Sequence, residues 1–452
     1  MLNIKTDSRL VSVGDTFIAI KGHTVDGHEY IKEAIKNGAS KIVAEYGSYD
    51  VPTLIVPDTE KYLNDFLVEN YSEKFNDIKF IGITGTNGKT TTAYLTSGML
   101  SKLNINNAYI GTIGFYVNSK LIKELPNTTP DILSLYNLIF EAIDNNVKVI
   151  VMEVSSHSLS MGRINGIKFD VTGFTNLTPD HLDYHETMEK YLEAKKLILN
   201  YIKDYGIMIS NIDDEYGVCF KYKNFKTIGF NESDYKIIEY SYTNLNTSIK
   251  FKYENKLYDV KTNLLNKFNI YNYLTALAFV NNIGVSIEDI IDITKEIYAP
   301  SGRNEIISVN GGKAIIDYAH TPDAVEKIIE STLENKSGKI ITIVGCGGDR
   351  DSTKRPIMGK IATNLSDYVI LTNDNPRTED EEKIMNDIIS GIKKDNYEVI
   401  YDRCEAIKKG LDMISDNDTL LILGKGHEDY QIIGHEKIHL SDKEEVLKYI
   451  EK

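Results

Sequence analysis

The segment from Gly85 to Thr92, Gly-Thr-Asn-Gly-Lys-Thr-Thr-Thr, has the composition of a loop that binds phosphate groups. It follows an apolar run at 80–84 and precedes a helical pattern. Backbone N–H groups in such a turn bind phosphate oxygens, and the N-terminus of the following helix assists them. Lys89 would reach the terminal phosphates of a nucleoside triphosphate, and the Thr90 hydroxyl would bind Mg²⁺. The residues expected to hold the phosphates are Gly85, Thr86, Asn87, Gly88, Lys89, Thr90 and Thr91.

The spacing of this loop differs from the commonest phosphate-loop motif, G-x-x-x-x-G-K-[ST], because that motif needs a glycine where the chain has Ile83. Only the inner half of the motif is present, from Gly85 to Thr90. A plain alternative is a glycine turn that caps a helix and carries a surface lysine. The succession of strand, turn, Lys, Thr and helix favours the phosphate loop over that alternative.

Two further polar side chains follow predicted strands and suit a bound metal ion. Glu153 ends the apolar run 148–153, where a carboxylate is costly to bury unless it is paired or bound to metal. His181 follows the run 170–175 and could add a neutral imidazole to a set of oxygen ligands. The alternatives are a hydrogen-bonded structural Glu and a capping His. Lys195 lies in a helical pattern, which by itself predicts an ordinary solvent-exposed lysine.

The last third of the chain has three polar, glycine-rich segments, each directly after an apolar run. They are 345–351, 373–377 and 424–429. All three carry acids, and two carry an arginine, Arg350 and Arg377. Arginine forks bind carboxylates in bidentate fashion and acids hold an ammonium, so the set suits a zwitterion. Each segment alone could be a turn with solvated charges, but three at parallel strand ends favour a binding site.

The elements that must position these residues alternate between strand and helix. Apolar, β-rich runs occur at 80–84, 148–153, 170–175, 314–317, 339–344, 367–372 and 419–423, and helical patterns at 93–103 and 129–145. Near-continuous apolar runs are typical of parallel strands that are buried on both faces. Ligands of open α/β sheets bind at the carboxyl ends of the strands, which is where the polar segments lie.

The pattern predicts three domains, with boundaries near 76 and 300. Residues 1–76 mix short strands and helices, whereas 77–300 and 301–452 follow the alternating pattern. We expect an α/β protein with a small N-terminal α/β domain, a central ATPase domain and a C-terminal Rossmann-like domain. The central domain would have a mostly parallel sheet of phosphate-loop type.

The second boundary coincides with a Pro/Gly break at 299–303. Arg303 lies in this break, and Asp317 and His320 follow the next apolar run. These three side chains could contact a nucleotide bound in the cleft between the last two domains.

The composition of the 452 residues, 42% hydrophobic and 26% charged, is that of an ordinary globular protein. The net charge of −15 argues against a general nucleic-acid binder, but a local basic pocket could still hold a phosphorylated substrate. No apolar run reaches the roughly 18 residues of a membrane helix, and the start lacks the apolar region of a signal peptide. The three widely spaced cysteines form neither a disulfide framework nor a zinc motif. We therefore expect a cytoplasmic protein with no membrane span and no nucleic-acid partner.

Several motifs together resemble the Mur ligase family. They are the loop 85–91, Glu153-Val-Ser-Ser-His157, Asp180-His-Leu-Asp-Tyr-His185, Asp317-Tyr-Ala-His320 and Gly424-Lys-Gly-His-Glu428. Each motif is a moderate signal alone, but their order and spacing are specific, and the resemblance runs from Asp7 to about Gln431. It implies an N-terminal domain for a uridine nucleotide, a central ATPase domain and a C-terminal Rossmann-like domain. It also implies a ligase of peptidoglycan synthesis that activates a carboxylate as an acyl phosphate and joins it to an amine.

Within the family, the chain looks most similar to members that add meso-diaminopimelate to UDP-N-acetylmuramoyl-L-alanyl-D-glutamate. In these members the tetrapeptide Asp374-Asn-Pro-Arg377 marks the choice of amino acid, with Arg377 on the distal carboxylate. Lysine-adding members lack that arginine, as expected because lysine has no second carboxylate and an unpaired buried guanidinium is costly. Contacts to the amino acid would come from Arg350, Asp374, Asn375, Pro376, Arg377, Gly424 and Glu428.

The resemblance also implies roles for the remaining residues. The metal ligands for two Mg²⁺ ions would be Thr90, Glu153, His181 and Lys195, the last through a carbamate on its amine. The further ATP contacts would be Asn269, Arg303, Asp317 and His320. The UDP-muramoyl dipeptide would contact Ser8, Thr128, Thr129, Ser155 and Arg163. The catalytic set would be Lys89, Glu153, His181 and Lys195, in an enzyme that we expect to be a monomer.

Two departures and three alternatives accompany this interpretation. Ser301 and Asn304 replace the usual Pro and Met of the family's Pro-Gly-Arg-Met-Glu, and Met161 replaces a common substrate-contacting Gln. One alternative is another amide ligase of the superfamily, either a folylpolyglutamate or cyanophycin synthetase or a lysine-adding Mur ligase. A nucleotide switch would need a guanine-reading Asn-Lys-x-Asp, which is absent from the sequence. A degenerate paralogue is disfavoured because the predicted catalytic set is intact.

Overall fold

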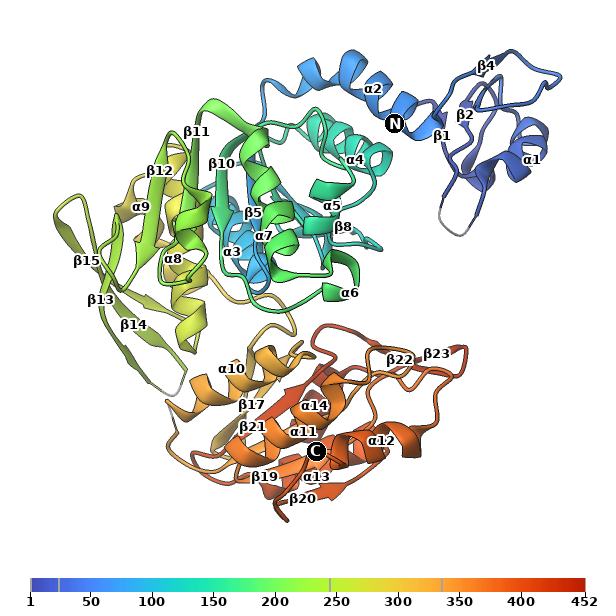
Figure 1. Cartoon of the computed structure of the whole chain (residues 1–452). Helices are drawn as coiled ribbons and strands as arrows, with labels where there is room; N and C mark the ends of the chain where they lie inside the picture. Colours follow the sequence, from blue (N-terminus) through green and yellow to red (C-terminus); the bar gives the residue numbers. More distant parts are fainter. Residues whose placement is uncertain (1, 23–24, 244, 335, 452) are drawn as a thin grey trace.

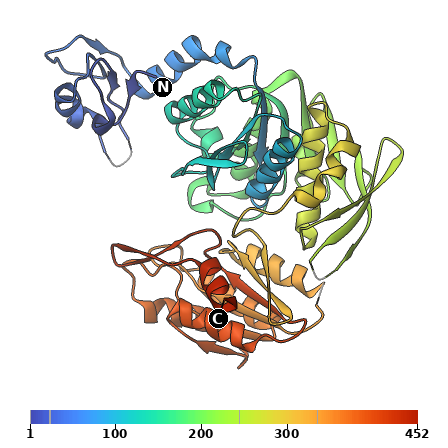
Figure 2. The same ribbon diagram turned by 180° about the vertical axis from the view of Figure 1, so that it is seen from behind.

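The computed structural model describes residues 2–22, 25–243, 245–334 and 336–451. It is an α/β protein of three domains, each built on its own sheet, as the sequence predicts (Figure 1). The small N-terminal domain (blue) projects from the central domain, and the C-terminal domain (orange to red) lies against the opposite part of it. Figure 2 shows the same arrangement from behind.

The N-terminal sheet is parallel, in the order β1-β2-β3-β4. Its strands are Ile4–Lys5, Thr16–Ile18, Lys41–Ala44 and Thr53–Ile55. Helix α1 (Ile31–Lys36) packs on the sheet through Ile31 and Ala34, which share a small core with Phe17 and Ile42. Helix α2 (Thr59–Tyr71) leads to the central domain, and the Asp58 side chain caps it by accepting a hydrogen bond from the Lys61 N–H.

The central sheet has eleven strands in the order β15-β14-β13-β12-β11-β10-β5-β9-β6-β7-β8. All neighbours from β13 to β6 are parallel, and only the pairs at the two ends are antiparallel. The parallel strands are β5 (Lys79–Thr84), β6 (Asn107–Gly111), β9 (Val149–Glu153), β10 (Phe169–Phe174), β11 (Ile202–Asn211), β12 (Phe225–Gly229) and β13 (Tyr235–Tyr242). The others are β7 (Gly114–Val117), β8 (Lys120–Lys123), β14 (Thr247–Tyr253) and β15 (Lys256–Thr262).

Strand β5 shows why the predicted strands are apolar throughout. Phe80 packs in one core with α4 (Ile132–Asp144), whereas Ile81 and Ile83 pack in a second core with α3 (Lys89–Lys102) and α8 (Lys267–Asn282). Both faces of the sheet are thus covered, which removes the polar alternation of a half-exposed strand. The other central helices are α5 (Ser156–Ser160), α6 (Leu182–His185), α7 (Met188–Lys196) and α9 (Ile287–Asp292).

The C-terminal sheet has the order β16-β17-β21-β18-β19-β20, parallel except for β16. Its strands are Glu305–Val309, Gly312–Asp317, Thr419–Leu423, Ile340–Val344, Tyr368–Leu371 and Tyr397–Val399, in that order. One face is covered by α10 (Pro322–Leu333), α11 (Lys354–Leu365) and α12 (Glu381–Ile389), and the other by α13 (Arg403–Met413) and α14 (Asp442–Ile450). The strands β22 (Tyr430–Ile433) and β23 (Glu436–His439) form a separate antiparallel hairpin outside this sheet. The predicted Rossmann-like architecture is confirmed.

Short 3₁₀ helices complete the described elements, at Ser8–Leu10, Gly27–Tyr30, Ser72–Phe75, Leu197–Tyr201, Gly217–Phe220 and Thr294–Glu296. None of the described helices is long and apolar enough to cross a membrane. The central and C-terminal domains are in direct contact. The Asp323 carboxylate of α10 accepts hydrogen bonds from the Asn87 side chain and the Thr178 hydroxyl, each at 3.1 Å.

Candidate functional site

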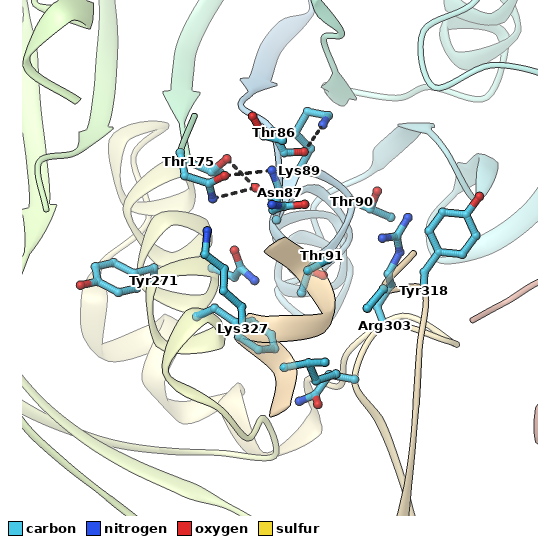
Figure 3. A pocket seen from close by; sticks show the side chains of 18 of the residues that line it. Thr86, Asn87, Lys89, Thr90, Thr91, Thr175, Tyr271, Arg303, Tyr318 and Lys327 are labelled. Carbon is cyan, nitrogen blue, oxygen red and sulfur yellow. Dashed lines mark hydrogen bonds between the residues drawn. The ribbon is translucent and has the colours of Figure 1, made fainter. Parts of the chain in front are cut away.

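The predicted phosphate loop joins β5 to α3, and the end of β10 fixes its shape. The Thr86 N–H donates to the Asn176 carbonyl at 2.8 Å, and the Thr175 hydroxyl donates to the Asn87 carbonyl at 2.7 Å (Figure 3). Gly85 has φ +145°, and a Cβ there would lie 1.9 Å from the Thr175 hydroxyl oxygen. Only glycine therefore allows the turn to approach β10 this closely.

Two lysines meet at this loop. Lys89 Nζ donates to the carbonyls of Gly85 and Thr86, at 3.0 and 2.8 Å, and Lys195 Nζ donates to the same Gly85 carbonyl at 2.7 Å. Lys195 is only 1% exposed, so the prediction of a solvent-exposed lysine from the helical pattern alone was wrong. Helix α7 packs its last turn against the loop, and burial, together with the charge of Lys89, holds the pKa of Lys195 well below its ordinary value. Burial also lowers the pKa of Lys89.

Glu153 is fully buried at the end of β9, with no exposed surface. Its Oε1 accepts hydrogen bonds from the Tyr109 hydroxyl at 2.6 Å and the Thr112 N–H at 2.9 Å. Its Oε2 accepts one from the Thr90 hydroxyl at 2.9 Å. Oxygens of a carboxylate and a threonine hydroxyl, side by side at a phosphate loop, are the ligands that Mg²⁺ prefers, so the predicted pair fits such an ion.

His181 begins α6 with φ +54°, and its side chain is half-exposed. Its Nε2 lies 3.5 Å from the Asp180 carboxylate, and its ring packs edge-on to His157 with centroids 5.0 Å apart. Burial lowers its pKa, which favours the neutral imidazole that a metal ligand requires. Among the described residues, no three His, Cys, Asp or Glu side chains gather closely enough to form a metal site by themselves. Any such site must therefore draw on other ligands, such as Thr90.

A cavity of about 700 Å³ opens between the central and C-terminal domains in front of the loop. Arg303, Asp317 and His320 line it, as predicted, and Arg303 stacks on the Tyr318 ring at 4.5 Å (Figure 3). The Arg303 Nε is buried without a hydrogen-bond partner among the described residues. Burial raises the pKa of Asp317 to about 6. A guanidinium beside a lysine-bearing loop, with a buried Nε that no described residue satisfies, fits a phosphorylated ligand.

One predicted nucleotide contact does not line this cavity. Asn269 is buried, donates to the Leu265 carbonyl at 2.9 Å and accepts from the Asn272 side chain at 2.9 Å. Asn272 does line the cavity, so Asn269 is connected to the cavity only through its hydrogen bond with Asn272.

Sequence reasoning missed the far wall of the cavity. The side chains there come from the helices α8 and α10, where no glycine-rich motif marks them: Lys267, Phe268, Tyr271, Asn272, Thr275, Lys327, Ile328, Glu330 and Ser331. Figure 3 shows Tyr271 and Lys327 among them. Only packing of the two helices in the tertiary structure brings these residues to one cavity.

Four of the predicted dipeptide contacts gather beside Glu153. Thr129 donates from its hydroxyl to the Glu153 carbonyl and accepts from the Ser155 N–H, at 2.9 and 3.1 Å. Arg163 donates to the Thr129 carbonyl at 3.2 Å and to the sulfur of Met161 at 3.1 Å. Thr128 lines the cavity and pairs with Thr112 at 3.0 Å. Ser8 lies apart, in the N-terminal domain, where its hydroxyl donates to Glu33.

The three polar segments of the C-terminal domain follow β18, β19 and β21, which are neighbours in the sheet. They lie in contact: the Asn375 side chain donates to Glu428 at 3.0 Å, and Arg377 Nη1 donates to the Gly348 carbonyl at 2.8 Å. Gly424 adjoins Asp374, since a Cβ on it would lie 2.6 Å from the Asp374 carboxylate. Pro376 lies in the same loop, and Arg350 is exposed nearby. The three segments are in contact, as predicted, and segment 424–429 adjoins the cavity, because the His427 ring lies 5.3 Å from the ring of Tyr318, which lines it.

The phosphate loop, the buried acid beside it and the Rossmann-like C-terminal domain together indicate a nucleotide-dependent enzyme. Family models give the same answer for the three domains: residues 2–67 match the Mur ligase family, catalytic domain, 83–280 the Mur ligase middle domain, and 302–426 the Mur ligase, glutamate ligase domain. The chain belongs to the Mur ligase family and is, as the sequence predicts, an ATP-dependent ligase.

Similar proteins cover nearly the whole chain. The UDP-N-acetylmuramoyl-L-alanyl-D-glutamate–2,6-diaminopimelate ligase 1 of Clostridium acetobutylicum is 41% identical over 99% of this chain and 94% of its own length. A solved structure of a ligase of that name has a TM-score of 0.71 at 30% identity, over 99% of this chain and 94% of that one. The MurF ligase of Thermotoga maritima in complex with ADP has a TM-score of 0.72 at 21% identity, over 100% and 97%, which shows the shared fold.

Proposed function

We propose that this ligase adds meso-diaminopimelate to UDP-N-acetylmuramoyl-L-alanyl-D-glutamate, with ATP, in peptidoglycan synthesis. The observation that carries the proposal is the meeting of the three polar segments at one end of the C-terminal sheet, where Asn375 donates to Glu428 and Arg377 donates to the Gly348 carbonyl. That arrangement presents a guanidinium and carboxylates to one ligand, as an amino acid with an additional carboxylate requires. The name of the similar ligase of Clostridium acetobutylicum agrees with this substrate.

ATP would bind with its phosphates on the N–H groups of the loop and at the N-terminus of α3. Lys89 would exchange its bonds to the Gly85 and Thr86 carbonyls for bonds to the terminal phosphates. Arg303, Asp317 and His320 would contact the nucleotide from the C-terminal side. Asn269 would support it through Asn272.

Mg²⁺, held by Thr90 and Glu153 and at a second position by His181 and Lys195, would neutralise phosphate charge. The D-glutamyl carboxylate oxygen then attacks the γ-phosphorus in line, and the bond from that phosphorus to the bridging oxygen breaks. ADP leaves, and an acyl phosphate remains. Ser8, Thr128, Thr129, Ser155 and Arg163 would hold the carboxylate-bearing substrate during this step.

The amine of diaminopimelate next attacks the acyl carbon. The tetrahedral intermediate collapses, the carbon–oxygen bond to phosphate breaks, and the amine loses a proton as the amide forms. Because an acyl phosphate reacts with water, the two sites must approach each other and exclude it. The hydrogen bonds from Asn87 and Thr178 to Asp323 already connect α10 of the C-terminal domain to the phosphate loop of the central domain.

Lys195 would act as a carbamate. Because burial lowers the pKa of Lys195, a larger fraction of its side chain is neutral amine than for an ordinary lysine, and the neutral amine can add to CO₂ with loss of a proton. The product is a carboxylate, which exchanges a buried cation beside Lys89 for an anion that suits both Lys89 and a metal ion. This exchange removes the repulsion between two ammonium groups on one carbonyl.

The proposal includes the domain limits 1–76, 77–300 and 301–452, a cytoplasmic location and action as a monomer. A lysine-adding ligase is the second candidate, since the cavity and the phosphate loop would serve either amino acid. Arg377 disfavours it, because lysine offers that guanidinium no distal carboxylate.

The test is phosphate release with UDP-muramoyl dipeptide, ATP and each of meso-diaminopimelate, L-lysine and L-ornithine. We expect release with meso-diaminopimelate and little with the other two. Release with none of the three would defeat the proposal, and preference for L-lysine would transfer it to the second candidate.

A further inference from the structure

Arg355, at the start of α11, has no role in the chemistry above, yet its side chain is fully buried. Its Nη1 donates to Glu379 Oε1 and to Asp387 Oδ2, each at 2.9 Å. Its Nη2 donates to Glu379 Oε2 at 2.6 Å and to the Gly347 carbonyl at 3.2 Å. A buried ion pair adds little net stability after its desolvation cost, so the value of this one lies in what it holds in place.

The network continues from Glu379 into the two arginine-bearing loops. Glu379 Oε2 also accepts a hydrogen bond from the Asp349 N–H at 3.0 Å. Asp349 Oδ2 in turn accepts from the N–H and hydroxyl of Thr378, at 3.0 and 2.9 Å. Asp349 directly precedes Arg350, and Thr378 directly follows Arg377. One buried guanidinium therefore ties together the backbone beside both arginines.

Two arginines also donate hydrogen bonds to adjacent carbonyls of the loop that carries Arg350. Arg355 holds the carbonyl of Gly347, and Arg377 Nη1 holds that of Gly348 at 2.8 Å. A Cβ on Gly348 would lie 1.9 Å from the Pro376 carbonyl oxygen, so the loops are in direct contact. Arg377 has φ +54°, a strained conformation that needs such support, and its backbone also bonds to Ile432 at 3.0 Å.

We propose that Arg355 is a positioning residue for the acceptor amino acid. It fixes the distance and orientation between Arg350 and Arg377, and through them it sets the preference for an amino acid with a carboxylate at its far end. The inference rests on the proposed function, since that function assigns the two arginines to the acceptor. Arg355 itself is buried and does not touch the substrate.

Arg355→Lys keeps the charge but cannot form the fork to Glu379. We expect the KM for meso-diaminopimelate to rise about tenfold or more, because a displacement of about 1 Å in positioning groups has effects of this size. The KM values for ATP and for the UDP-muramoyl dipeptide should stay within about twofold of wild type, because the substitution does not change the residues that bind those two substrates. The preference for meso-diaminopimelate over L-lysine, as a ratio of kcat/KM, should fall by the same factor as the acceptor KM rises.

Lys383→Gln is the matched control. Lys383 also contacts Glu379 Oε1, at 3.0 Å, but its side chain is 66% exposed and it reaches neither loop. Its loss should leave every KM unchanged. Glu379→Gln is the second variant, because the change is nearly isosteric and Arg355 keeps Asp387 as an ionic partner. It should reproduce the effect of Arg355→Lys, and the double variant should be no worse than the poorer single variant, as expected of one shared contact.

Three outcomes overturn the inference. An acceptor KM within about twofold of wild type in both variants would show that the fork does not position the loops. Equal rises in all three KM values would show a structural role only. Both results leave the proposed function intact if wild type uses meso-diaminopimelate and Arg377→Ala impairs that use. Failure of wild type to use meso-diaminopimelate would overturn the inference and the proposed function together.

Discussion

Lys89 and Lys195 donate to the same oxygen, the carbonyl of Gly85, at 3.0 and 2.7 Å. They lie 106 positions apart in the numbering, counted from 89 to 195, and come from α3 and α7. Two ammonium groups on one neutral acceptor repel each other, and the repulsion is strong where solvent is excluded. A change in the charge of one lysine would relieve this repulsion, and Lys195 is the more deeply buried of the two.

A carbamate on Lys195 is the first prediction. Protein incubated with ¹³C-bicarbonate should show a carbonyl resonance of a carbamate that Lys195→Ala lacks, because the lowered pKa supplies the neutral amine. The resonance should grow as the pH rises, because CO₂ adds to the neutral amine and protonation of the amine removes it. Identical spectra for wild type and Lys195→Ala would remove the carbamate from the account.

Lys195 should also make the free energy of unfolding depend on pH. Its pKa is lowered in the folded state, so between that value and the ordinary value of about 10.4 the unfolded chain binds one more proton than the folded chain. Stability contributed by Lys195 therefore rises with pH across this window, by about 1.4 kcal/mol per pH unit. Urea unfolding of wild type and Lys195→Met in CO₂-free buffer measures it. The free energy of unfolding of wild type should increase relative to that of Lys195→Met as the pH rises. A difference that stays constant with pH would contradict the lowered pKa.

Glu153→Gln tests the proposed metal ligand. The change keeps the shape but removes the charge next to the Thr90 hydroxyl, so kcat should fall at least about 100-fold, as expected when several kcal/mol of metal assistance is lost. The Mg²⁺ concentration for half-maximal rate should rise as well. Tyr109→Phe removes a hydrogen bond to the same carboxylate and keeps its charge, so its loss should be much smaller. Equal losses in the two variants would indicate that Glu153 has a structural role.

Arg377→Ala tests the choice of amino acid. Loss of one charge-assisted hydrogen-bonding group is worth about 1.5–3 kcal/mol, so the KM for meso-diaminopimelate should rise roughly ten- to a hundredfold. The slow use of L-lysine should not decline, because lysine has no distal carboxylate to lose a partner. An unchanged KM for meso-diaminopimelate would remove Arg377 from the acceptor site.

Sequence reasoning succeeded where function depends on strand ends. Glu153, the loop from Gly85 and the three polar segments all follow buried parallel strands, and apolar runs identify such strands without knowledge of the tertiary fold. Composition also identified both later sheets, because strands covered on both faces are apolar throughout.

It failed where helices meet. The burial of Lys195 depends on the packing of α7 against the phosphate loop, and its local sequence, Leu-Glu-Ala-Lys-Lys, has the polarity of an exposed helix. The role of Arg355 has the same origin, since its partners Glu379 and Asp387 are distant in the sequence. Neither position carries a local pattern that predicts its contacts.

The most direct test of the account follows the oxygen of the substrate carboxylate. UDP-muramoyl dipeptide labelled with ¹⁸O in the D-glutamyl carboxylate is converted with ATP and meso-diaminopimelate, and phosphate and product are analysed by mass spectrometry. An acyl phosphate predicts one ¹⁸O in each phosphate released and a product heavier by diaminopimelate less one labelled water, with neither formed by Lys89→Ala. Amide product accompanied by unlabelled phosphate would contradict the account.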